Sequence, residues 1–370
     1  SGSVHGTAFQ RGVSLSPTCT SCHGIHSIKM VAAEGASIRE QHLVRTSGPV
    51  CHASEALMSE YGVSAARVAT DQASYHGLAR TRGNAVVADC ASCPGIHDIS
   101  PSDDPRSKVA PAKLKDTCGG CHPGASEEFA QAAVHYSEGD LATAEPGVKV
   151  VVWVKRVYWS LLIGVLGGML IHNMIILGYY VRRKLRQERN MPGRVRFTGI
   201  QIAQHVMLVT TFVVLAATGF MLAYPETWWS EILVKLGVTE SIRRWVHRGA
   251  AIGMLLASIY HGVWIWVSPY GRKELRRMMP GRRDLTEFIQ NMQFHLGVRD
   301  RGPSFAKYDD PAKAEYWALV WGTIVMAVTG VVLWFPVWAT SFMPAWSVKV
   351  SEVIHLFEAW LATLAILIFH

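Results

Sequence analysis

The stretch CTSCHGIHSI at residues 19–28 returns almost unchanged as CASCPGIHDI at residues 90–99. The offset is 71 residues, and the most consequential difference is Pro94, which stands where the first copy has His23. Cys-x-x-Cys-His is the attachment motif of c-type haem: two thiols form thioethers with the porphyrin, and the adjacent histidine is placed to ligate iron. The duplicated decamer therefore indicates a chain that binds haem at more than one place.

The duplication extends beyond these decamers. SVHG with His5 recurs as SYHG with His76 at an offset of 71 residues, and GPVCH at 48–52 recurs as CGGCH at 118–122 at an offset of 70. Residues 1–147 are polar and lack long hydrophobic periodicity. They are predicted to form a tandem repeat of about 71 residues, with two cysteine sites in each copy.

Cysteine and histidine are concentrated in this region, which holds all seven cysteines and nine of the sixteen histidines. The odd cysteine number argues against a simple disulfide framework. A zinc ribbon would use four thiolates and would leave the histidine after each cysteine pair unexplained. Haem attachment accounts for both residue types. The predicted attachment residues are Cys19, Cys22, Cys51, Cys90, Cys93, Cys118 and Cys121.

Two of the four cysteine sites are complete and two are imperfect. The complete motifs end in His23 and His122. At the site that ends in His52, Gly48 replaces the first cysteine, so a singly attached haem is chemically feasible. At the Cys90 site both thiols are present, but Pro94 cannot supply the usual imidazole. We predict four haems c, with degeneration of the two imperfect sites as the alternative.

Ligand counting supports four haems, because bis-histidine ligation of four irons needs eight imidazoles and this region has nine histidines. His23, His52 and His122 are the predicted proximal ligands. The candidate distal ligands that recur in register between the copies are His5, His26, His76 and His97, and two more that do not recur are His42 and His135. A solvated side chain is the alternative for each. Stacked porphyrins would then form much of the core.

From residue 148 the composition changes abruptly to long apolar segments. They cover about 157–181, 198–223, 245–267, 315–337 and 350–370. Each of the first four is long enough to cross a hydrocarbon layer of about 30 Å, and the fifth would be if it continued. The predicted fold is mostly α: a loop-rich multihaem c domain over residues 1–147 and a transmembrane helical bundle of at least five helices over residues 148–370.

Positive charge gathers in the connections at 182–196 and 272–313, whereas those at 224–244 and 338–349 carry tryptophans. The positive-inside rule places the basic connections in the cytoplasm and the N-terminal domain in the periplasm of a bacterial inner membrane. Buried helices of a soluble protein would not explain this asymmetry. The basic runs are expected to contact anionic membrane lipid, and no nucleic-acid site is predicted.

Histidines inside apolar segments are costly unless they face a partner or a cavity. His247 and His261 are 14 residues apart in the third segment, and His355 and His370 are 15 apart in the fifth, which corresponds to about 21 and 22 Å along a helix. These two helices run parallel, so His247 meets His355 near the outer surface, and His261 and His370 lie near the inner one. This is the geometry of two b-type haems. His205 also reaches the inner layer, and His172 lies in the first segment.

Several stretches carry a family resemblance: RVRFTGIQIAQH, AATG, RRWVHR, YWALVWGTIVMAVTGVVLWFP and VIHLFEAWLATLAILIFH, in this order within residues 194–370. This region resembles the cytochrome b subunit of formate dehydrogenase, the gamma-subunit family of diheme quinone-reactive proteins. The resemblance implies that His247 and His355 ligate the outer haem b and that His205 and His370 ligate the inner one. It also implies a menaquinol or ubiquinol site beside the inner haem.

The chain departs from that family in its extra leading helix, its longer histidine spacing in the last segment, and His261. His261 and His172 are then surplus to the inner haem. Three roles stay open for them: a third haem b, proton exchange with quinone, or ordinary polar contacts between helices. Thr218-Gly219 and Thr329-Gly330 are expected either to admit a porphyrin close to the helix backbone or to serve helix packing. Glu358 is expected to cap a buried hydrogen-bond network or to relay protons.

The whole chain resembles membrane cytochromes that fuse a periplasmic multihaem c domain to such a b domain. The predicted function is electron transfer between the quinone pool and periplasmic c haems, with quinol:cytochrome c-type oxidoreductase activity and onward transfer to a periplasmic carrier. A non-catalytic wiring subunit of a larger respiratory or photosynthetic complex is the alternative. No catalytic side chain is predicted beyond the quinone site. Both termini are expected to be incomplete, since the chain begins within a repeat and stops within an apolar run.

Overall fold

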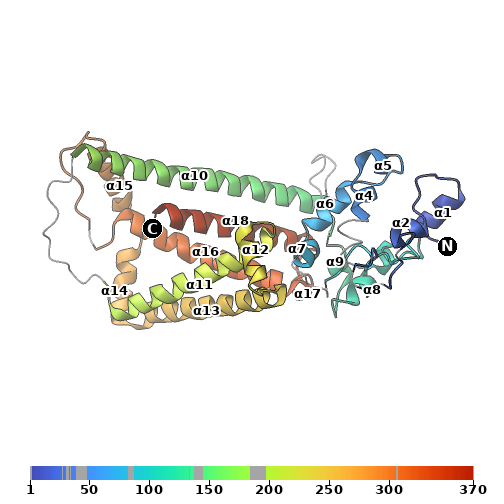
Figure 1. Ribbon diagram of the computed structural model, residues 1–370. Coiled ribbons are helices and arrows are strands. Elements are labelled where there is room, and N and C mark those ends of the chain that lie inside the picture. Colours follow the sequence, from blue (N-terminus) through green and yellow to red (C-terminus); the bar gives the residue numbers. More distant parts are fainter. Residues whose placement is uncertain are drawn as a thin grey trace. The chain divides into compact units, whose positions relative to one another are not determined.

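The structure, a computed structural model, describes residues 2–26, 28–30, 33, 35–38, 48–81, 87–132, 134–136, 145–183, 197–305 and 307–369. His42 and His370 lie outside the described residues. Every regular element within these ranges is a helix, and five of the helices are long and apolar enough to cross a membrane (Figure 1). The predicted mostly α fold with a bundle of at least five helices is therefore confirmed.

The chain divides into two compact units. The first unit comprises residues 1–149, 221–243 and 335–349. The second unit comprises residues 150–220, 244–334 and 350–370. Two connections between long helices thus group with the N-terminal residues, which a single boundary at 147/148 does not anticipate. The division into a domain over 1–147 and a domain over 148–370 stays a prediction.

The N-terminal part of the first unit is built from short helices and turns. These helices are α1 (Val4–Gln10), α2 (Cys19–His23), α4 (Gly48–His52), α5 (Glu55–Ser59), α6 (Ala66–Gln72), α7 (Tyr75–Thr81), η2 (Pro111–Lys113), α8 (Leu114–Gly119) and α9 (Glu127–Ala130). Serine caps begin several of them: the Ser3 hydroxyl accepts from the Gly6 amide at 3.1 Å, and Ser126 accepts from Phe129 at 3.0 Å. Such caps stabilise helices that are too short to persist alone.

The apolar core of this N-terminal part is made of small side chains. Its buried apolar residues among those described are Ala36, Met58, Ala65, Ala79, Ala110 and Ala125. Larger apolar side chains such as Phe9, Leu15 and Ile25 are exposed instead. Alanine buries too little area to hold a region of this size together. A further large apolar component is needed, and bound porphyrins would supply it.

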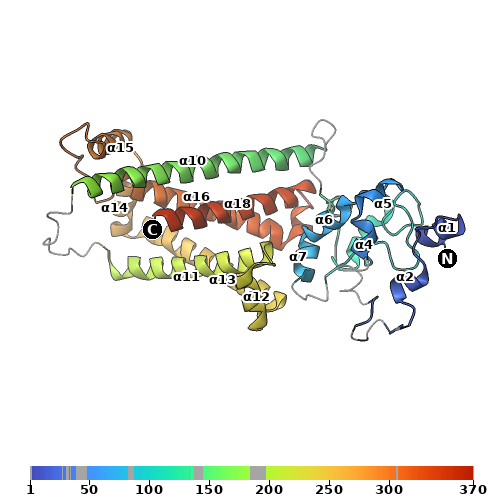
Figure 2. The ribbon, with the colours of Figure 1, turned by 45° about the horizontal axis from the view of Figure 1, so that its top comes forward.

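The long helices are α10 (Pro146–Arg183), α11 (Gly199–Ala223), α13 (Glu240–Val267), α16 (Asp310–Trp334) and α18 (Trp346–Phe369). Even the shortest membrane span found in them has 23 residues, which is about 35 Å of helix and exceeds a hydrocarbon core of about 30 Å. Helices satisfy all their backbone hydrogen bonds internally, as a lipid environment requires. Figures 1 and 2 both show α11 running beside α13, and α16 beside α18.

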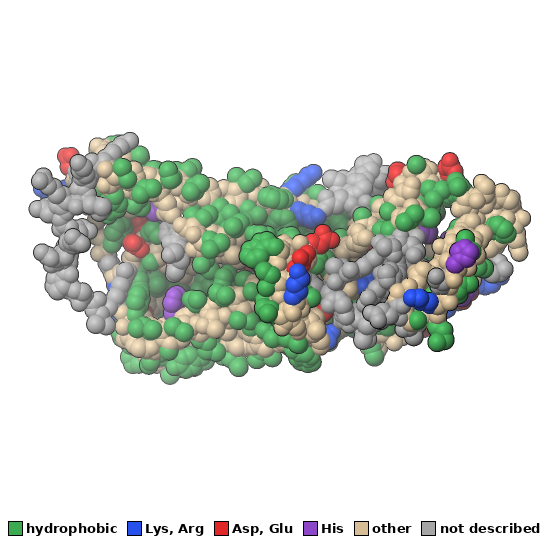
Figure 3. All heavy atoms as spheres, in the orientation of Figure 1, with side chains coloured by type: hydrophobic (Ala, Val, Ile, Leu, Met, Phe, Trp, Pro, Cys, Tyr) green, Lys and Arg blue, Asp and Glu red, His purple; other side chains and the backbone are tan. Residues whose placement is uncertain are grey.

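Aromatic and polar contacts join the long helices within the second unit. The Phe220 and Trp360 rings of α11 and α18 are centred 4.6 Å apart, and the Asn173 amide of α10 donates to the Ile368 carbonyl of α18 at 3.1 Å. The outer faces are apolar, as Figure 3 shows, with side chains such as Ile163 and Ile171 exposed. A surface of this kind suits lipid and not water.

Four shorter helices lie in the connections: α12 (Trp228–Lys235), α14 (Pro269–Met278), α15 (Arg282–His295) and α17 (Pro336–Ala339). The basic helices α14 and α15 are fixed to the start of α16. Lys313 of α16 pairs with Asp284 of α15 at 2.6 Å, and the Trp317 indole donates to the Met278 carbonyl at 2.9 Å. The basic connection is therefore an ordered part of the second unit.

Candidate functional site

Three pairs of imidazole rings lie close together in the N-terminal part. His5 and His52 have ring centres 6.1 Å apart, and their counterparts in the second repeat, His76 and His122, have centres 6.3 Å apart. The tilt between the rings is also nearly the same, at 49° and 46°. The two copies of the repeat thus place equivalent histidines in equivalent pairs.

The third pair joins the two copies of the repeat. His23 of the first copy and His97 of the second have ring centres 6.3 Å apart and planes only 8° from parallel. Six of the nine histidines predicted as haem c ligands are therefore brought together in twos.

The separation of each pair fits one metal ion between two imidazoles. A metal–imidazole bond is about 2.0–2.1 Å, and a ring nitrogen lies about 1.1 Å from the ring centre for ring bonds of about 1.3–1.4 Å, so ring centres on one metal are about 6.3 Å apart. Rings packed against each other would be much closer, with carbon atoms about 3.5–4.0 Å apart. The residues present therefore fit bis-imidazole iron.

Two of the cysteine sites lie on single short helices that also carry one of these rings. Helix α2 carries Cys19, Cys22 and His23, and helix α4 carries Cys51 and His52. Residues spaced by three and four positions share one face of a helix, so both thiols and the histidine can approach the same porphyrin. All seven cysteines are described, and all are free thiols. They are thus available for attachment.

Burial favours the uncharged form of four of the paired imidazoles by lowering their pKa. It lowers the pKa of His5 and His52, with a further lowering from His52 on His5 and from Arg67 on His52. Burial likewise lowers the pKa of His76 and His122. These rings are neutral at neutral pH, which is the form that ligates a metal.

Two of the remaining histidines, His26 and His135, have no imidazole partner among the described residues. His26 is exposed and has no ring partner among the described residues, and His42 lies outside them. His135 makes a different contact, because its Nδ1 atom lies 3.2 Å from the Thr70 hydroxyl. Pro94 stands at the position where a fourth pair would need an imidazole.

A fourth imidazole pair lies among the membrane helices. His247 of α13 and His355 of α18 have ring centres 6.5 Å apart with planes tilted by 60°. This separation is close to that of the three pairs described above and fits one metal between the rings in the same way. The structure thus brings together the two residues predicted to ligate the outer haem b.

Each of these rings is held by a threonine of the preceding long helix. Thr218 Oγ1 lies 2.8 Å from His247 Nδ1, and Thr329 Oγ1 lies 2.9 Å from His355 Nδ1. Both hydroxyls also lie within donating distance of a carbonyl one turn earlier, at 2.6 Å for Thr218 and 2.7 Å for Thr329. Each hydroxyl therefore donates to its own helix and accepts from the Nδ1–H of the ring. Nε2 is left as the nitrogen whose lone pair can bind a metal.

The glycines next to these threonines give the rings room. A Cβ atom at Gly219 would lie 3.5 Å from Cε1 of His247, and one at Gly330 would lie 3.5 Å from Cε1 of His355. Any side chain longer than alanine would press on the imidazole. The two Thr-Gly pairs thus act on the histidines directly, a role that was not predicted from the sequence.

His261, in the inner part of α13, is hydrogen-bonded through both ring nitrogens. Nδ1 lies 3.1 Å from Gln204 Oε1 of α11, and Nε2 lies 3.1 Å from the Tyr316 hydroxyl of α16. With both nitrogens engaged, neither has a lone pair directed at iron. This arrangement favours a polar or quinone-related role for His261 over a third haem b.

Gln204 itself offers an unused donor. Its Nε2 atom is buried and has no hydrogen-bond partner among the described residues. A buried amide without a partner is costly, and such a group commonly marks a place where a ligand binds. Neither Gln204 nor Tyr316 was predicted from the sequence, because a single glutamine or tyrosine in an apolar segment carries no pattern.

The other residues predicted for the inner layer are His205, His370 and His172. His205 is exposed on α11, and His370 lies outside the described residues. His172 of α10 has its Nδ1 atom 3.3 Å from Asn173 Oδ1 and its ring stacked 6.1 Å from that of Phe288. The described residues therefore do not test the His205–His370 pair.

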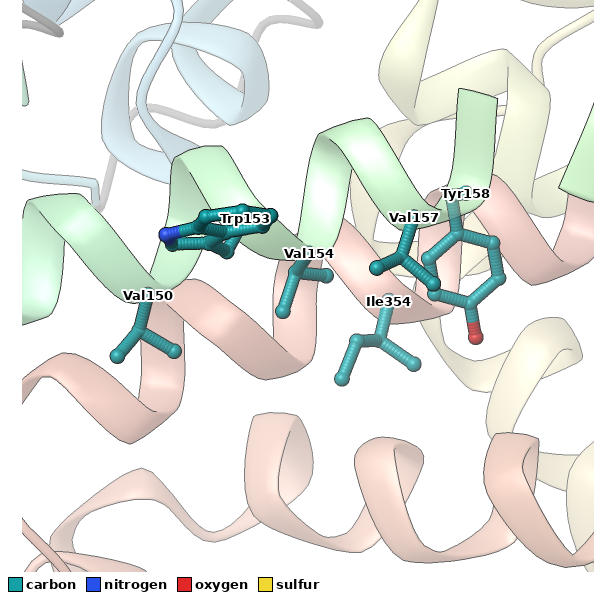
Figure 4. Close-up of a pocket in the computed structure, with 6 residues that line it drawn as sticks. All are labelled: Val150, Trp153, Val154, Val157, Tyr158 and Ile354. Carbon is teal, nitrogen blue, oxygen red and sulfur yellow. The ribbon is translucent and has the colours of Figure 1, made fainter. Parts of the chain in front are cut away.

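Glu358 forms part of a buried contact between α10 and α18. Its Oε2 atom accepts a hydrogen bond from the Tyr158 hydroxyl at 3.0 Å. Next to this contact is a shallow groove of about 290 Å³, lined by Val150, Trp153, Val154, Val157, Tyr158 and Ile354 (Figure 4). The Tyr158 hydroxyl is already engaged by Glu358, so this mainly apolar groove does not orient a polar quinone head.

Comparison with known proteins gives matches over the C-terminal half. Residues 196–370 match the family described as prokaryotic cytochrome b561. Over 161 residues the chain is 25% identical to the cytochrome b556(Fdn) subunit of the nitrate-inducible formate dehydrogenase of Escherichia coli K12, which covers 44% of this chain and 68% of that protein. The subunits of E. coli O157:H7 and Shigella flexneri match with the same identity and coverage. No solved structure matches the chain.

The matched region contains His247 and His355 together with their threonine partners. The five apolar helices and this similarity support an integral membrane protein that takes part in electron transfer. Residues 196–370 are thus similar to the cytochrome b561 family, whose members are cytochromes that bind haem b.

Proposed function

We propose that this protein oxidises quinol in the membrane and passes the electrons to c-type haems carried by its N-terminal residues. The observation that carries the proposal is the common separation of four imidazole pairs, 6.1 to 6.5 Å between ring centres, at positions predicted to ligate iron. Three pairs lie beside cysteine sites and one lies within the region similar to the cytochrome b561 family. When bound, the haems supply one-electron donors and acceptors.

We infer four haems c. The pair of His5 and His52 supports a haem at the site where Gly48 replaces a cysteine, because both axial imidazoles are present and only one thioether is lost. His23 with His97 and His76 with His122 would hold the haems of the two complete motifs. The fourth would be attached at Cys90 and Cys93.

In the membrane domain, His247 and His355 would hold the outer haem b. Thr218 and Thr329 would fix the tautomer and orientation of these imidazoles by accepting their Nδ1–H bonds. The assignment of His205 and His370 to an inner haem b rests on the resemblance to the formate dehydrogenase subunit.

The quinone head would bind at Gln204, His261 and Tyr316. The buried Gln204 Nε2 is a donor for a quinone oxygen, and the His261 imidazole can accept a proton. Oxidation of one quinol breaks two O–H bonds, releases two protons and delivers two electrons one at a time. Tyr316 holds the His261 ring through Nε2 and so orients the proton acceptor.

The charge pattern supports a bacterial inner-membrane location with the N-terminal part in the periplasm. The basic helices α14 and α15 would face the cytoplasm and its anionic lipid, and tryptophans such as Trp228 and Trp338 would lie at the outer interface. The partners would be menaquinol or ubiquinol and a periplasmic electron carrier.

A wiring subunit is the second candidate. The matched relatives are named as subunits of formate dehydrogenase, which favours a role inside a larger respiratory assembly. In that case this chain would pass electrons between other subunits without turning over quinone itself. The two candidates differ in whether the isolated protein is reduced by quinol.

The test is anaerobic reduction of the purified protein by menadiol or a short-chain ubiquinol, followed at the α bands of the b and c haems. Quinol oxidation predicts reduction of both haem types. Tyr316→Phe is expected to slow it about tenfold, since about one hydrogen bond is lost, while Tyr260→Phe on the exposed face of α13 is the matched control. A protein with full haem content that no quinol reduces would be a wiring subunit.

A further inference from the structure

The backbone around the two decamers follows the same course in both copies. In the first copy the Ser21 amide donates to the Thr18 carbonyl at 3.0 Å, and the Gly24 amide donates to Thr20 at 2.9 Å. In the second copy the equivalent bonds run from Ser92 to Asp89 at 3.1 Å and from Gly95 to Ala91 at 3.0 Å. Each bond recurs at the 71-residue offset of the sequence.

Two more features repeat. The Ser21 hydroxyl accepts from the Thr18 amide at 3.1 Å, and the Ser92 hydroxyl accepts from the Asp89 amide at 3.0 Å. The chain then leaves through a glycine with positive φ in both copies, +79° at Gly24 and +92° at Gly95, a conformation that favours glycine. Pro94 therefore stands in the backbone position that carries the ligating imidazole in the first copy.

The register of the imidazole pairs shows which residue Pro94 should face. His5–His52 and His76–His122 are the same pair in the two copies. The pair between copies joins His23 to His97. In the other copy of the repeat, the residue equivalent to His23 is Pro94, and the residue equivalent to His97 is His26.

Within the part of the chain that the structure describes, His26 thus has no ring partner, and this register gives the Cys90 site one imidazole. Proline has no nitrogen lone pair for iron, because its ring nitrogen belongs to the peptide bond. Both thiols of the site, Cys90 and Cys93, remain free for attachment. A haem held there would be ligated on one face by His26 and would have no proximal ligand on the other.

We propose that the haem attached at Cys90 and Cys93 keeps an open coordination position on the side of Pro94, where it binds a small neutral iron ligand of the carbon monoxide or nitric oxide class. The proposal rests on the proposed function only in requiring that haem c is attached. The open coordination position distinguishes this haem from the other three, whose irons would have an imidazole on both faces.

Lys108 is the other nearby side chain to consider as an iron ligand at this position. Lys108 Nζ lies 3.8 Å from the Asp98 carboxylate, and a Cβ atom at Gly95 would lie 3.4 Å from that same Nζ. Lys108 is therefore close to the turn that follows Pro94. Its amine is engaged by the Asp98 carboxylate, and an ammonium group has no lone pair for iron.

The test is carbon monoxide titration of the reduced, full-length protein, with the c haems counted by pyridine haemochrome. We expect one CO-binding haem for every four c haems, and one high-spin ferric signal in electron paramagnetic resonance. Pro94→His is expected to abolish both while the c-haem count stays the same. Pro94→Ala is the matched control and should retain both. Binding by a b haem would persist in Pro94→His and is thereby distinguished.

The axial ligand is tested separately by resonance Raman of the ferrous protein. The iron–imidazole stretching band should be lost in His26→Ala and retained in His135→Ala. Four low-spin c haems without CO binding would overturn the proposal. So would a protein that has fewer c haems and whose Cys90 thiol still reacts with an alkylating reagent, because no haem is then attached at Cys90. CO binding that appears only in Lys108→Ala or His42→Ala would overturn it too, since that side chain would then be the ligand. A protein with no covalent haem at all would instead refute the proposed function.

Discussion

The Nδ1 atom of His247 lies 2.8 Å from the Oγ1 atom of Thr218, and His355 stands in the same relation to Thr329 at 2.9 Å. In each case the threonine belongs to the long helix that precedes the histidine's helix, and a glycine follows the threonine directly. The same kind of threonine contact thus holds each imidazole of the His247–His355 pair. A metal-ligating histidine usually has a partner of this kind on its other nitrogen.

We predict that Thr218→Val raises the midpoint potential of the outer haem b. The hydroxyl makes the imidazole a stronger donor to iron and so favours the oxidised form, and its loss removes that preference. A hydrogen bond of about 0.5–1.5 kcal/mol corresponds to about 20–60 mV for one electron. A spectroelectrochemical titration of the b haem absorption measures the change.

Thr218→Ser is the control for this prediction, because it keeps the hydroxyl and removes only a methyl group. Its potential should stay close to that of the unmodified protein. Equal potentials in all three proteins would mean that the Thr218 hydroxyl does not act on a haem ligand.

The second prediction concerns haem content. His247→Ala or His355→Ala should remove one haem b per chain and leave the c haems in place, because each removes half of one axial pair. Pyridine haemochrome analysis counts the two haem types separately. His295→Ala, on helix α15 and outside the imidazole pairs, is the matched control. Full haem b content in both variants would rule out this pair as the ligands.

The third prediction uses the pair that joins the two repeats. His97→Ala should make the haem attached at Cys19 and Cys22 high-spin, although His97 is 75 residues from Cys22 in the sequence, 97 minus 22. The number of CO-binding c haems should then rise by one. His135→Ala should leave that number unchanged, because His135 contacts Thr70 instead. An unchanged number in His97→Ala would refute the pairing.

The fourth prediction concerns a buried carboxylate in the basic connection. Glu274 accepts hydrogen bonds from Lys307 at 2.7 Å and from Arg277 at 2.8 Å, and also from Tyr308. Burial alone would raise the pKa of Glu274, but these hydrogen bonds outweigh it and the net pKa is lowered. A lowered folded-state pKa means that the carboxylate stabilises the fold above about pH 4.3, its unfolded value, and that this contribution is lost as the pH falls through the folded value.

Glu274→Gln should therefore lower the free energy of unfolding by about 1–3 kcal/mol at pH 7, and this difference should shrink below about pH 4. Thermal unfolding of the detergent-solubilised protein at both pH values measures it. Glu226→Gln, which changes an exposed glutamate, should have no such effect. A Glu274→Gln difference that is independent of pH would show that the carboxylate charge is not the cause.

The sequence predicted the helical class correctly, because this class depends on local patterns of hydropathy. The haem-attachment cysteines also follow from a local motif, and they stay a prediction. The sequence also singled out His5, His76 and His97 by their recurrence in the repeat, and the structure places each of them opposite another imidazole. It could not assign the partners, since the pair of His23 and His97 depends on how the two copies fold against each other.

The hydrogen-bond partners of His261 could not be predicted from the sequence. His261 was identified because a histidine in an apolar segment is unusual, but its partners Gln204 and Tyr316 come from two other helices. Nothing in the spacing of either residue distinguishes it from an ordinary side chain. Contacts between helices of this kind depend on the rotation of each helix about its axis, which a single sequence does not define.

The alanine-sized core of the N-terminal part has a consequence for how the protein is made. A region whose buried apolar side chains are mostly alanine methyl groups would have little reason to collapse before its porphyrins arrive, much as small metal-binding domains stay unfolded without their ion. Under the proposed function, haem attachment would then precede compaction, on an extended polypeptide that has already crossed the membrane. Biogenesis would be ordered as export, covalent loading and only then folding, so a defect in the loading step would expose the chain to periplasmic proteases.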